Sequence, residues 1–426
     1  MIQLNGKLLK ITKQKEGNRM SEVIERFLRY VKIETTSSET SETAPSTAIQ
    51  RDLASLLYKE LTDMGASDVY YDEEHCYVYA KIPASNGYEN RKTLGFIAHM
   101  DTSPEASGKN VKPRIIENYD GEDIVLNKEL NIVLETAKYP EIKAYKGQRI
   151  IVTDGTTLLG ADDKAGVAEI MAMANTLLSH PEIPHGPVAV AFTPDEEIGA
   201  GTVNFDMERF GADYAYTVDG GGIGELEYET FNAASAVIEI TGVNVHTGEA
   251  KNKMINAARI AAEFDSMLPA EQRPEFTEGR EGFYHLMGIE GSTESAKLVY
   301  LIRDHDRMIF ENRKAIMYGI GDQLDFRYGA GTVKVNIKDT YYNMREKIEP
   351  DFMFLIDNAC EVMKGLGIEP KIQPIRGGTD GSALSFRGLP CPNICTGGHN
   401  YHGRFEYCCA DSMEKISEIL IMLTAK

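Results

Sequence analysis

The sequence lacks long apolar runs and has few cysteines, and these absences exclude several classes of protein. No stretch of about 18 or more apolar residues occurs, which excludes a transmembrane helix. The basic N-terminal residues lack the apolar core and the small-residue cleavage site of a signal peptide. The 6 cysteines, which include the adjacent Cys408 and Cys409, form neither a disulfide scaffold nor a CxxC pair for structural zinc. We therefore expect a cytoplasmic protein.

Positive charge is also scarce. The chain of 426 residues carries 45 Lys and Arg against 65 Asp and Glu, a formal net charge of -20. No basic stripe is present to displace counterions from phosphate, which argues against a nucleic-acid or anionic-membrane partner. The composition, 42% hydrophobic and 26% charged, is that of a globular protein, and the length favours two domains. This balance fits a soluble enzyme, or a protein that concentrates cations.

Strand-like and helical patterns alternate in the first half of the chain and predict an α/β fold with helices on both faces of a sheet. The Ser/Thr-rich residues 35–47 read as a surface loop. Helical spacing returns at 354–363 and 416–423 and is expected to complete the same domain. The earlier helices are expected at 48–64 and 167–178, and the strands at Tyr77–Ile82, Leu94–Ala98, Val188–Phe192 and Tyr214–Val218.

The stretch from about 230 to 345 has a different order of elements. Its patterns read strand, helix, strand, strand, helix, strand, which is the βαββαβ unit of a ferredoxin-like layer. We therefore expect residues 1–229 and 346–426 to form one domain and residues 230–345 to form an inserted α+β domain. The expected elements are Ala236–Ile240, Met254–Leu268, Tyr284–Ile289, Lys297–Arg303, Met308–Tyr318 and Thr332–Ile337.

Acidic and histidine side chains follow the predicted strands of the first domain. An acidic triplet such as Asp195–Glu197 is by itself typical of a solvated loop, and a lone histidine after a strand is usually structural. Open α/β sheets, however, bind ligands at the carboxyl ends of their strands, where loops gather distant side chains. Several successive strands that each end in a histidine or carboxylate favour a metal site. The residues are His99, Asp101, Asp162, Asp163, Glu196, Glu197, Asp219, His399 and His402.

The types of ligand limit which metal ions the site can bind. Imidazole with carboxylate suits zinc, manganese or cobalt, whereas an all-oxygen site suits magnesium or calcium. The set is too large for one four-coordinate zinc but suffices for two metals about 3.5–4 Å apart that share a carboxylate. Asp101 comes two residues after His99, which places it on the same side of an extended chain, where it can hold the His99 ring. Glu197 is expected to bind metal, which leaves Glu196 free to take a proton from the activated water and deliver it to a leaving amine.

With these residues assembled, the sequence resembles the M20 family of co-catalytic zinc peptidases from about Ser21 onward. The resemblance implies a zinc-exopeptidase-like catalytic domain, with a mixed sheet between helices, and an α+β lid. Residues 1–20 have no counterpart, and Met20 is a candidate natural start. The matching segments are GFIAHMDTSPEASGKNVKP, TLLGADDKAGVAEIM, TPDEEIGAG, YTVDGG, VHTGEAKNKMINA and TGGHNYHGRFEY.

The resemblance implies a role for each residue and two zinc ions per subunit, with manganese or cobalt as substitutes. A cis peptide bond is expected between Asp162 and Asp163. His399 is a rival for the last ligand position, although HGRFE supplies the family's His-x-x-x-Glu pattern. The implied roles are His99 and Asp219 on one zinc, Glu197 and His402 on the other, Asp162 as the bridge, Glu196 as the general base and Asp101 as the residue that orients His99.

Three residues outside the first domain's metal set are further candidates for the site. His246 corresponds to a lid histidine that stabilises the oxyanion, with a surface histidine as the alternative interpretation. Arg303 and Arg376 are expected to anchor carboxylate or carbonyl groups of a peptide, although Arg303 has Asp304 and Asp306 as alternative partners. The resemblance also allows a homodimer formed through the lid.

The activity implied by the resemblance is the release of the N-terminal residue from tripeptides. An N-acyl-amino-acid deacylase or a dipeptidase keeps the same metal ligands, so the substrate stays open on these residues. A non-catalytic metal-binding protein is disfavoured, because a protein that only stores metal needs no general base such as Glu196 beside its ligands. A nucleotide-dependent oxidoreductase, suggested by GGGIGE at 220–225, is excluded because the glycines do not fit GxGxxG between a strand and a helix.

Overall fold

The computed structural model describes residues 20–426, and its contacts divide the chain into two compact units. The first comprises the chain up to Tyr228 with Lys347–Gln373 and Thr379–Lys426; the second comprises Glu229–Glu346 and Pro374–Gly378. The expectations about residues 1–19 lie outside the described residues. Within 20–426, no helix combines the length and the apolar character needed to cross a bilayer.

The short segment Pro374–Gly378 was expected in the first domain but belongs to the second unit. The amide of Ile375 donates to the carbonyl of Glu229 at 2.8 Å, and the amide of Phe231 donates to the carbonyl of Gly377 at 3.2 Å. Backbone pairing between segments so far apart in the sequence leaves no local pattern, which is why composition did not reveal it.

The first unit is built on an eight-stranded mixed sheet in the order β1-β2-β8-β3-β9-β16-β10-β15. The central strands β8, β3, β9 and β16 run parallel, while β1, β2 and β10 join by antiparallel pairs. Every residue of β3 and β8 is buried, as expected for strands covered on both faces. The strand bounds, in the order of the sheet, are β1 Ser67–Asp72, β2 Tyr77–Ile82, β8 Val188–Thr193, β3 Leu94–His99, β9 Tyr214–Gly220, β16 Asn393–Cys395, β10 Glu225–Glu227 and β15 Lys371–Ile372.

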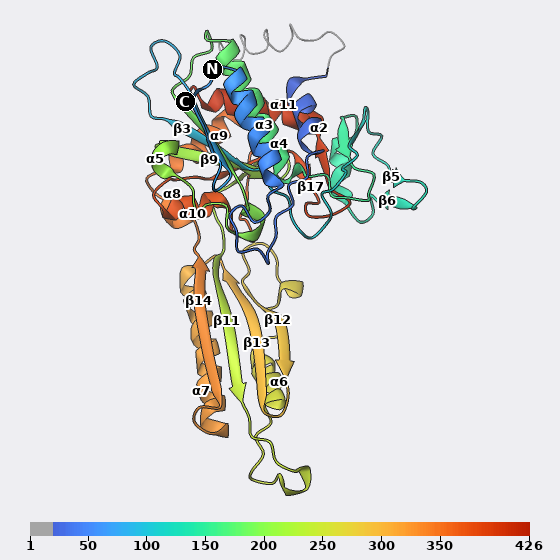
Figure 1. Ribbon diagram of the computed structural model, residues 1–426, viewed down its shortest axis with the longest axis vertical. Helices are drawn as coiled ribbons and strands as arrows, with labels where there is room; N and C mark the ends of the chain where they lie inside the picture. The colour runs from blue at the N-terminus through green and yellow to red at the C-terminus, as the bar shows by residue number, and fades with distance from the viewer. Residues whose placement is uncertain (1–19) are drawn as a thin grey trace. The chain divides into compact units, whose positions relative to one another are not determined.

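Two apolar clusters cover the two faces of this sheet. Along β3, Phe96 and Ala98 belong to the larger cluster with helix α4, whereas Ile97 belongs to a smaller cluster with Phe210 of α5. This alternation confirms the predicted α/β sheet with helices on both faces (Figure 1). The helices are α2 (Glu22–Tyr30), α3 (Gln50–Asp63), α4 (Ala161–Ser179), α5 (Met207–Phe210), α8 (Arg345–Ile348), α9 (Met353–Gly365), α10 (Asp380–Phe386) and α11 (Ala410–Leu423).

Short strands between residues 114 and 152 were not predicted, because three or four residues are too few to show a period. Of these, β4 and β7 form a sheet with the later strands β17 and β18, in the order β17-β18-β7-β4, and β5 and β6 form a hairpin. The surface-loop interpretation of residues 35–47 was wrong in part, since Thr35, Ser37 and Ser46 are buried. The bounds are β4 Arg114–Ile116, β5 Ile124–Asn127, β6 Ile132–Leu134, η1 Pro140–Tyr145, β7 Ile150–Val152, η2 Glu196–Ile198, β17 Gly398–His399 and β18 Tyr407–Cys409.

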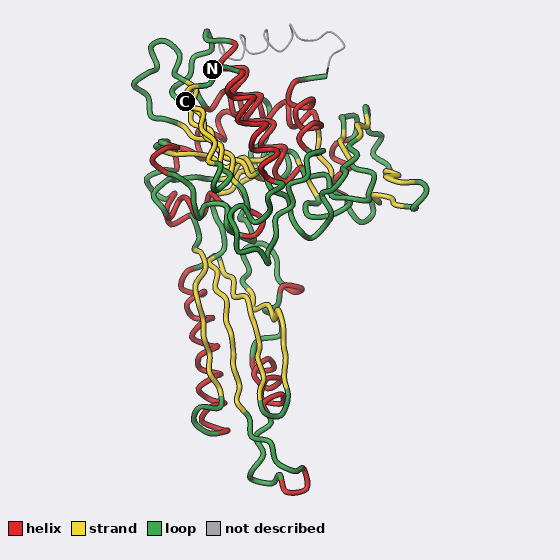
Figure 2. The backbone as a smooth tube through the Cα atoms, viewed as in Figure 1, coloured by secondary structure: helices red, strands yellow, loops and turns green. Residues whose placement is uncertain are grey.

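The second unit is an antiparallel sheet in the order β12-β13-β11-β14, with α6 and α7 packed on it. Its long strands lie side by side in Figure 2. The chain order β11, α6, β12, β13, α7, β14 confirms the predicted βαββαβ unit. The bounds are β11 Asn232–Thr241, η3 Thr247–Glu249, α6 Ala257–Met267, η4 Pro274–Phe276, β12 Phe283–Gly291, β13 Ser295–Asp304, α7 Arg307–Tyr328 and β14 Val333–Tyr341.

Gly166 lets α4 approach β9 closely, and its substitution is expected to be costly. A Cβ atom at this position would lie 1.9 Å from the carbonyl oxygen of Val218 and 2.5 Å from Oδ1 of Asp163. We expect Gly166→Ala to lower the free energy of unfolding by about 3 kcal/mol in urea titrations. The control is Gly319→Ala in α7, where nothing lies within 4 Å and a gain of about 0.5–1 kcal/mol is expected. Equal effects of the two substitutions would contradict this packing argument.

Candidate active site

The first unit brings together the carboxylates and histidines that the sequence places after its strands. His99 ends β3, Asp219 lies near the end of β9, and Glu196 and Glu197 form the turn η2 directly after β8. Asp162 lies at the start of α4, and His402 lies in the loop between β17 and β18. Parallel central strands place these residues at one edge of the sheet, as the general rule for ligand sites in open α/β sheets predicts.

Asp162 lies between two pairs of side chains. Its Oδ1 is 2.8 Å from Nε2 of His99, and that same nitrogen is 3.6 Å from Oδ1 of Asp219. Its Oδ2 is 3.2 Å from Nε2 of His402, which in turn lies 2.9 Å from Oε2 of Glu197. Each oxygen of one carboxylate thus faces a different histidine and a different acidic partner, which is the arrangement of a bridging ligand.

The donor set fits metal ions. Ligand atoms of His99, Asp162 and Glu197 lie within 4.8 Å of one another, and so do those of His99, Glu196 and Asp219. Among the side chains that the structure describes, Glu197 has a buried oxygen, Oε1, without a hydrogen-bond partner. A buried carboxylate oxygen without a donor is costly unless a cation satisfies it. The second group also places Glu196 beside the position that His99 and Asp219 would share.

Negatively charged groups outnumber positively charged ones in this cluster. Burial, with repulsion from Asp162, raises the pKa of Glu197 to about 7 and that of Asp219 to about 6. Burial and the nearby Asp219 also raise the pKa of Glu196 well above its ordinary value. Hydrogen bonds that the His402 ring donates to the carboxylates of Asp162 and Glu197 raise the pKa of His402 to about 11. Crowded carboxylates that draw positive charge onto histidine are the electrostatic setting in which dications bind favourably.

Asp101 contacts both the first histidine and the acidic turn. Nδ1 of His99 lies 3.2 Å from the backbone carbonyl of Asp101 and 3.3 Å from its Oδ1. The same carboxylate accepts the backbone amides of Glu196 at 3.0 Å and Glu197 at 3.2 Å. Because Asp101 is fully buried, these contacts fix the His99 ring relative to the two glutamates.

Glu406 has a role that the sequence did not reveal. Its carboxylate accepts the backbone amides of Leu159, Gly160, Ala161 and Asp162 at distances from 2.6 to 3.1 Å. The loop that carries Asp162 is therefore fixed by a residue four positions after His402. The only signal was the Glu of the His-x-x-x-Glu pattern. As expected, the peptide bond between Asp162 and Asp163 is cis.

Comparison with known proteins identifies the family. The model for peptidase family M20/M25/M40 matches residues 152–426. This chain belongs to that family. A peptidase T from Geobacillus kaustophilus is 57% identical over 400 residues, which cover 94% of this chain and 97% of the relative. Another from Alkaliphilus oremlandii is 53% identical over 405 residues, covering 95% of this chain and 98% of the relative. The predicted M20 resemblance is thus confirmed.

Solved structures share the fold of this M20 peptidase. An aminopeptidase PepT from Bacillus cereus has a TM-score of 0.74 at 23% identity, covering 95% of this chain and 97% of that one. A tripeptidase from Staphylococcus aureus has the same TM-score at 22% identity and the same coverage. A dinuclear metal-binding M20 peptidase from Bacillus subtilis has a TM-score of 0.65 at 14% identity, covering 95% of this chain and 96% of that one.

The other candidate histidine of this M20 peptidase, His399, has its own partners. Its Nε2 lies 2.6 Å from the hydroxyl of Tyr145, and its ring stacks on Tyr407 with 4.9 Å between ring centroids. Burial lowers the pKa of His399 to about 4, with a smaller effect from the charge of Lys371. A neutral imidazole enclosed by tyrosines is a packed structural group. His402, in contrast, contacts Asp162 and Glu197 directly.

The remaining predicted residues, His246, Arg303 and Arg376, belong to the second unit of the M20 chain. His246 is exposed, and its Nδ1 accepts the amide of Gly248 at 3.1 Å. Arg303 donates to the carbonyls of Ala234 and Ile302 rather than to Asp304 or Asp306. The guanidinium of Arg376 donates to the carbonyls of Gly279 and Glu281 and to the hydroxyl of Thr277.

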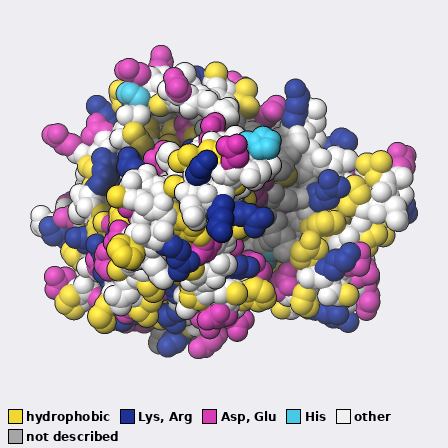
Figure 3. Space-filling model, turned by 90° about the horizontal axis from the view of Figure 1, so that it is seen from below, with side chains coloured by type: hydrophobic (Ala, Val, Ile, Leu, Met, Phe, Trp, Pro, Cys, Tyr) yellow, Lys and Arg dark blue, Asp and Glu magenta, His cyan; other side chains and the backbone are white. Residues whose placement is uncertain are grey.

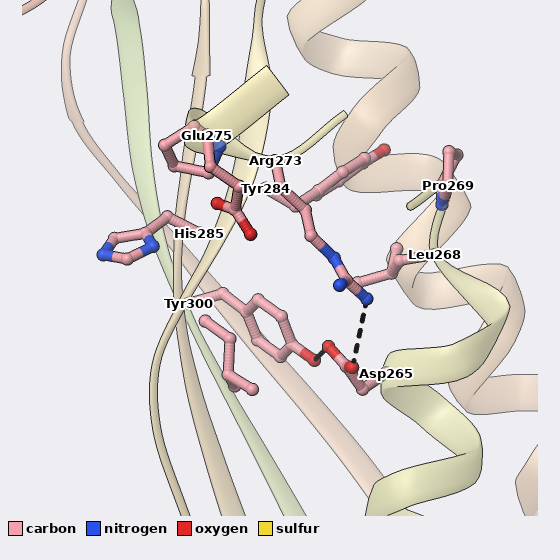
Figure 4. Close-up of a pocket in the computed structure, with 10 residues that line it drawn as sticks. Asp265, Leu268, Pro269, Arg273, Glu275, Tyr284, His285 and Tyr300 are labelled. Carbon is pink, nitrogen blue, oxygen red and sulfur yellow. Dashed lines mark hydrogen bonds and ion pairs between the residues drawn. The ribbon is translucent and has the colours of Figure 1, made fainter. Parts of the chain in front are cut away.

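A cavity of about 230 Å³ also lies in the second unit, between α6, β12 and β13. In Figure 4, Tyr300 and Arg273 both point toward Asp265. The Tyr300 hydroxyl donates to Asp265 at 3.0 Å, and Arg273 lies 3.5 Å from the same carboxylate. The side chains of Asp265, Arg273 and Tyr300 thus satisfy one another within this cavity.

Proposed function

We propose that this M20 peptidase is an aminopeptidase that releases the N-terminal residue of tripeptides. The observation that carries the proposal is the position of Asp162 between two histidine–carboxylate pairs, with Glu196 beside them. The similarity to proteins named peptidase T over nearly the whole chain supports the choice of tripeptides as substrate.

The proposed cofactors are two zinc ions per subunit, for which manganese or cobalt can substitute. His99 and Asp219 would hold one ion, Glu197 and His402 the other, and Asp162 both. When bound, the ions supply Lewis-acid activation of water and of the scissile carbonyl. Imidazole nitrogens combined with carboxylates, and the unsatisfied oxygen of Glu197, support this assignment.

The proposed roles of the protein side chains follow from their positions. Glu196 takes the proton of the attacking water and passes it to the leaving amine, because its carboxylate lies within the cluster while Glu197 contacts His402. Asp101 holds the ring of His99 and the backbone of the acidic turn. Burial raises the pKa of Glu196, which suits a base that must also return its proton.

Residues 230–345 are proposed as a lid that closes on the substrate and excludes water. In this proposal His246 stabilises the oxyanion, and Arg303 and Arg376 bind carboxylate or carbonyl groups of the peptide. A fixed distance between these basic groups and the metal ligands would select tripeptides over dipeptides and longer chains. The exposed ring of His246 supports its availability to a substrate.

The proposed setting is the cytoplasm, with small peptides as partners and neither nucleic acid nor membrane. Cys76, Cys360, Cys391, Cys395, Cys408 and Cys409 are all free thiols, as a reducing compartment favours. On the face seen in Figure 3, acidic side chains are interspersed with basic and apolar ones. A homodimer through residues 230–345 is also proposed, supported by the exposed side chains of Met308 and Phe326 on α7.

The substrate prediction is tested by hydrolysis of trialanine, dialanine and N-acetyl-trialanine with the zinc-loaded protein. We expect fast release of the first residue from trialanine and at least about 100-fold lower kcat/KM for the other two, because the site reads both ends of the substrate. Equal cleavage of the acetylated peptide would instead assign an N-acyl-amino-acid deacylase, and preference for dialanine would assign a dipeptidase.

A further inference from the structure

The turn that carries the two glutamates begins with a residue in an unusual conformation. Asp195 has φ 56° and ψ 24°, in the left-handed region that non-glycine residues seldom adopt. The chain then forms the single turn η2 and leaves it at Gly199, where φ is 71°. Since Glu196 and Glu197 follow Asp195 directly, its conformation sets the direction in which both carboxylates project.

Asp195 is fixed by residues about 145 positions earlier in the chain. Its Oδ2 accepts the amide of Ser46 at 2.7 Å, and its Oδ1 accepts the Ser46 hydroxyl at 2.5 Å and Nε2 of Gln50 at 2.6 Å. The Asp195 amide donates to Oε1 of Gln50 at 3.2 Å. All three side chains are buried, and charge-assisted hydrogen bonds of this length are among the strong ones.

The segment that supplies Ser46 also contacts the loop of the first histidine. The amide of Ser37 donates to the carbonyl of Thr102 at 3.1 Å, and the amide of Thr102 donates to the carbonyl of Thr35 at 3.2 Å. Thr102 follows Asp101, whose carboxylate accepts the amides of Glu196 and Glu197. Residues 35–50 therefore hold the acidic turn from one side and the Asp101 loop from the other.

We propose that Asp195 is a positioning residue for the reaction, and that Ser46 and Gln50 act through it. The side chain of Asp195 hydrogen-bonds to Ser46 and Gln50, so it acts through the turn and not on a reacting atom. Its carboxylate holds the turn in the left-handed conformation that separates the tasks of Glu196 and Glu197. This inference rests on the proposed function, because the task of Glu196 is defined by that reaction.

The test compares kcat and KM for trialanine in zinc-loaded wild type, Asp195→Gly and Ser46→Ala. Glycine accepts the positive φ and removes the whole Asp195 side chain with its carboxylate, so the substitution introduces no backbone strain. We expect kcat of Asp195→Gly to fall about 10- to 100-fold, with KM within about threefold and zinc content unchanged, because small misplacement of a catalytic group has effects of this size. Ser46→Ala is expected to lower kcat about 3- to 10-fold, and Ser46→Thr, which keeps the hydroxyl, to restore it.

A double variant separates positioning from general destabilisation. If Ser46 acts through Asp195, then kcat of the Ser46→Ala and Asp195→Gly combination equals that of Asp195→Gly within about twofold. Glu42→Gln, an exposed position in the same segment, is the control and should match wild type. Unchanged kcat in Asp195→Gly, or multiplicative losses in the double variant, would overturn the proposal. If Asp195→Gly does not fold, unchanged kcat in Ser46→Ala overturns it.

The failure of this proposal is distinguishable from failure of the proposed function. A zinc-loaded wild type that does not cleave trialanine disproves the tripeptidase assignment before any variant is compared. The same variants are then assayed on whichever of dialanine or N-acetyl-trialanine the wild type hydrolyses, and the kcat and double-variant criteria apply unchanged.

Discussion

Glu196→Gln is expected to lower kcat for trialanine about 10³- to 10⁴-fold while the metal content of the protein stays at the wild-type value. Glutamine preserves the shape of the side chain but cannot accept the proton of the attacking water. The acidic turn should keep its geometry, because the backbone amide of Glu196 is held by Asp101 and not by its own side chain. The measurement pairs steady-state kinetics with the metal content of the same sample.

The matched control is Glu197→Gln, one residue further along the same turn. Its carboxylate lies 2.9 Å from His402 and has a buried oxygen without a partner, so it is expected to be a ligand. This variant should lose metal as well as activity. If Glu196→Gln instead loses metal while Glu197→Gln keeps it, the two roles are exchanged and our assignment is wrong.

Asp162→Asn is expected to weaken the binding of both metal ions. In the proposed site the Asp162 carboxylate would place one negative charge beside two dications, and the amide of asparagine removes that charge. At an effective dielectric constant of about 20, a unit charge pair about 4 Å apart contributes about 4 kcal/mol, which corresponds to about 10³-fold in affinity. The measurement is competition for zinc with a chromogenic chelator, followed by activity at saturating zinc.

The control for the loss of one negative charge is Asp357→Asn, at an exposed position of α9. It should leave zinc affinity within about twofold of wild type, since exposed charges at a distance are screened by solvent. A single weakened site in Asp162→Asn, with the other at wild-type affinity, would contradict the bridging role.

Much of the fold and of the cluster was predictable because its signals are local. Strands such as Leu94–His99 and Val188–Thr193 show buried apolar runs, and the ligand types stand at their carboxyl ends. The order of elements in the second unit also followed from periodicity alone. A parallel sheet then brings those ends together, so geometry between distant residues followed from a rule about strand direction.

The contacts that support the cluster were not predictable, because they join segments with no shared pattern. Ser46 contacts Asp195 across 149 residues of sequence, and Glu406 accepts the amide of Asp162 across 244 residues. Ser46 lies in a Ser/Thr-rich segment whose composition is typical of a polar loop. Arg376 likewise carries no sign that its guanidinium donates to the backbone around Gly279.

We propose that two metals share Asp162 while Glu196 ligates neither. Anomalous X-ray diffraction at the zinc edge, on crystals of the zinc-loaded protein, distinguishes this arrangement from the alternatives. We expect two peaks about 3.5–4 Å apart, one beside His99 and Asp219 and the other beside Glu197 and His402, with Asp162 contacting both. A single peak, or a peak with the Glu196 carboxylate at bonding distance, would contradict the claim.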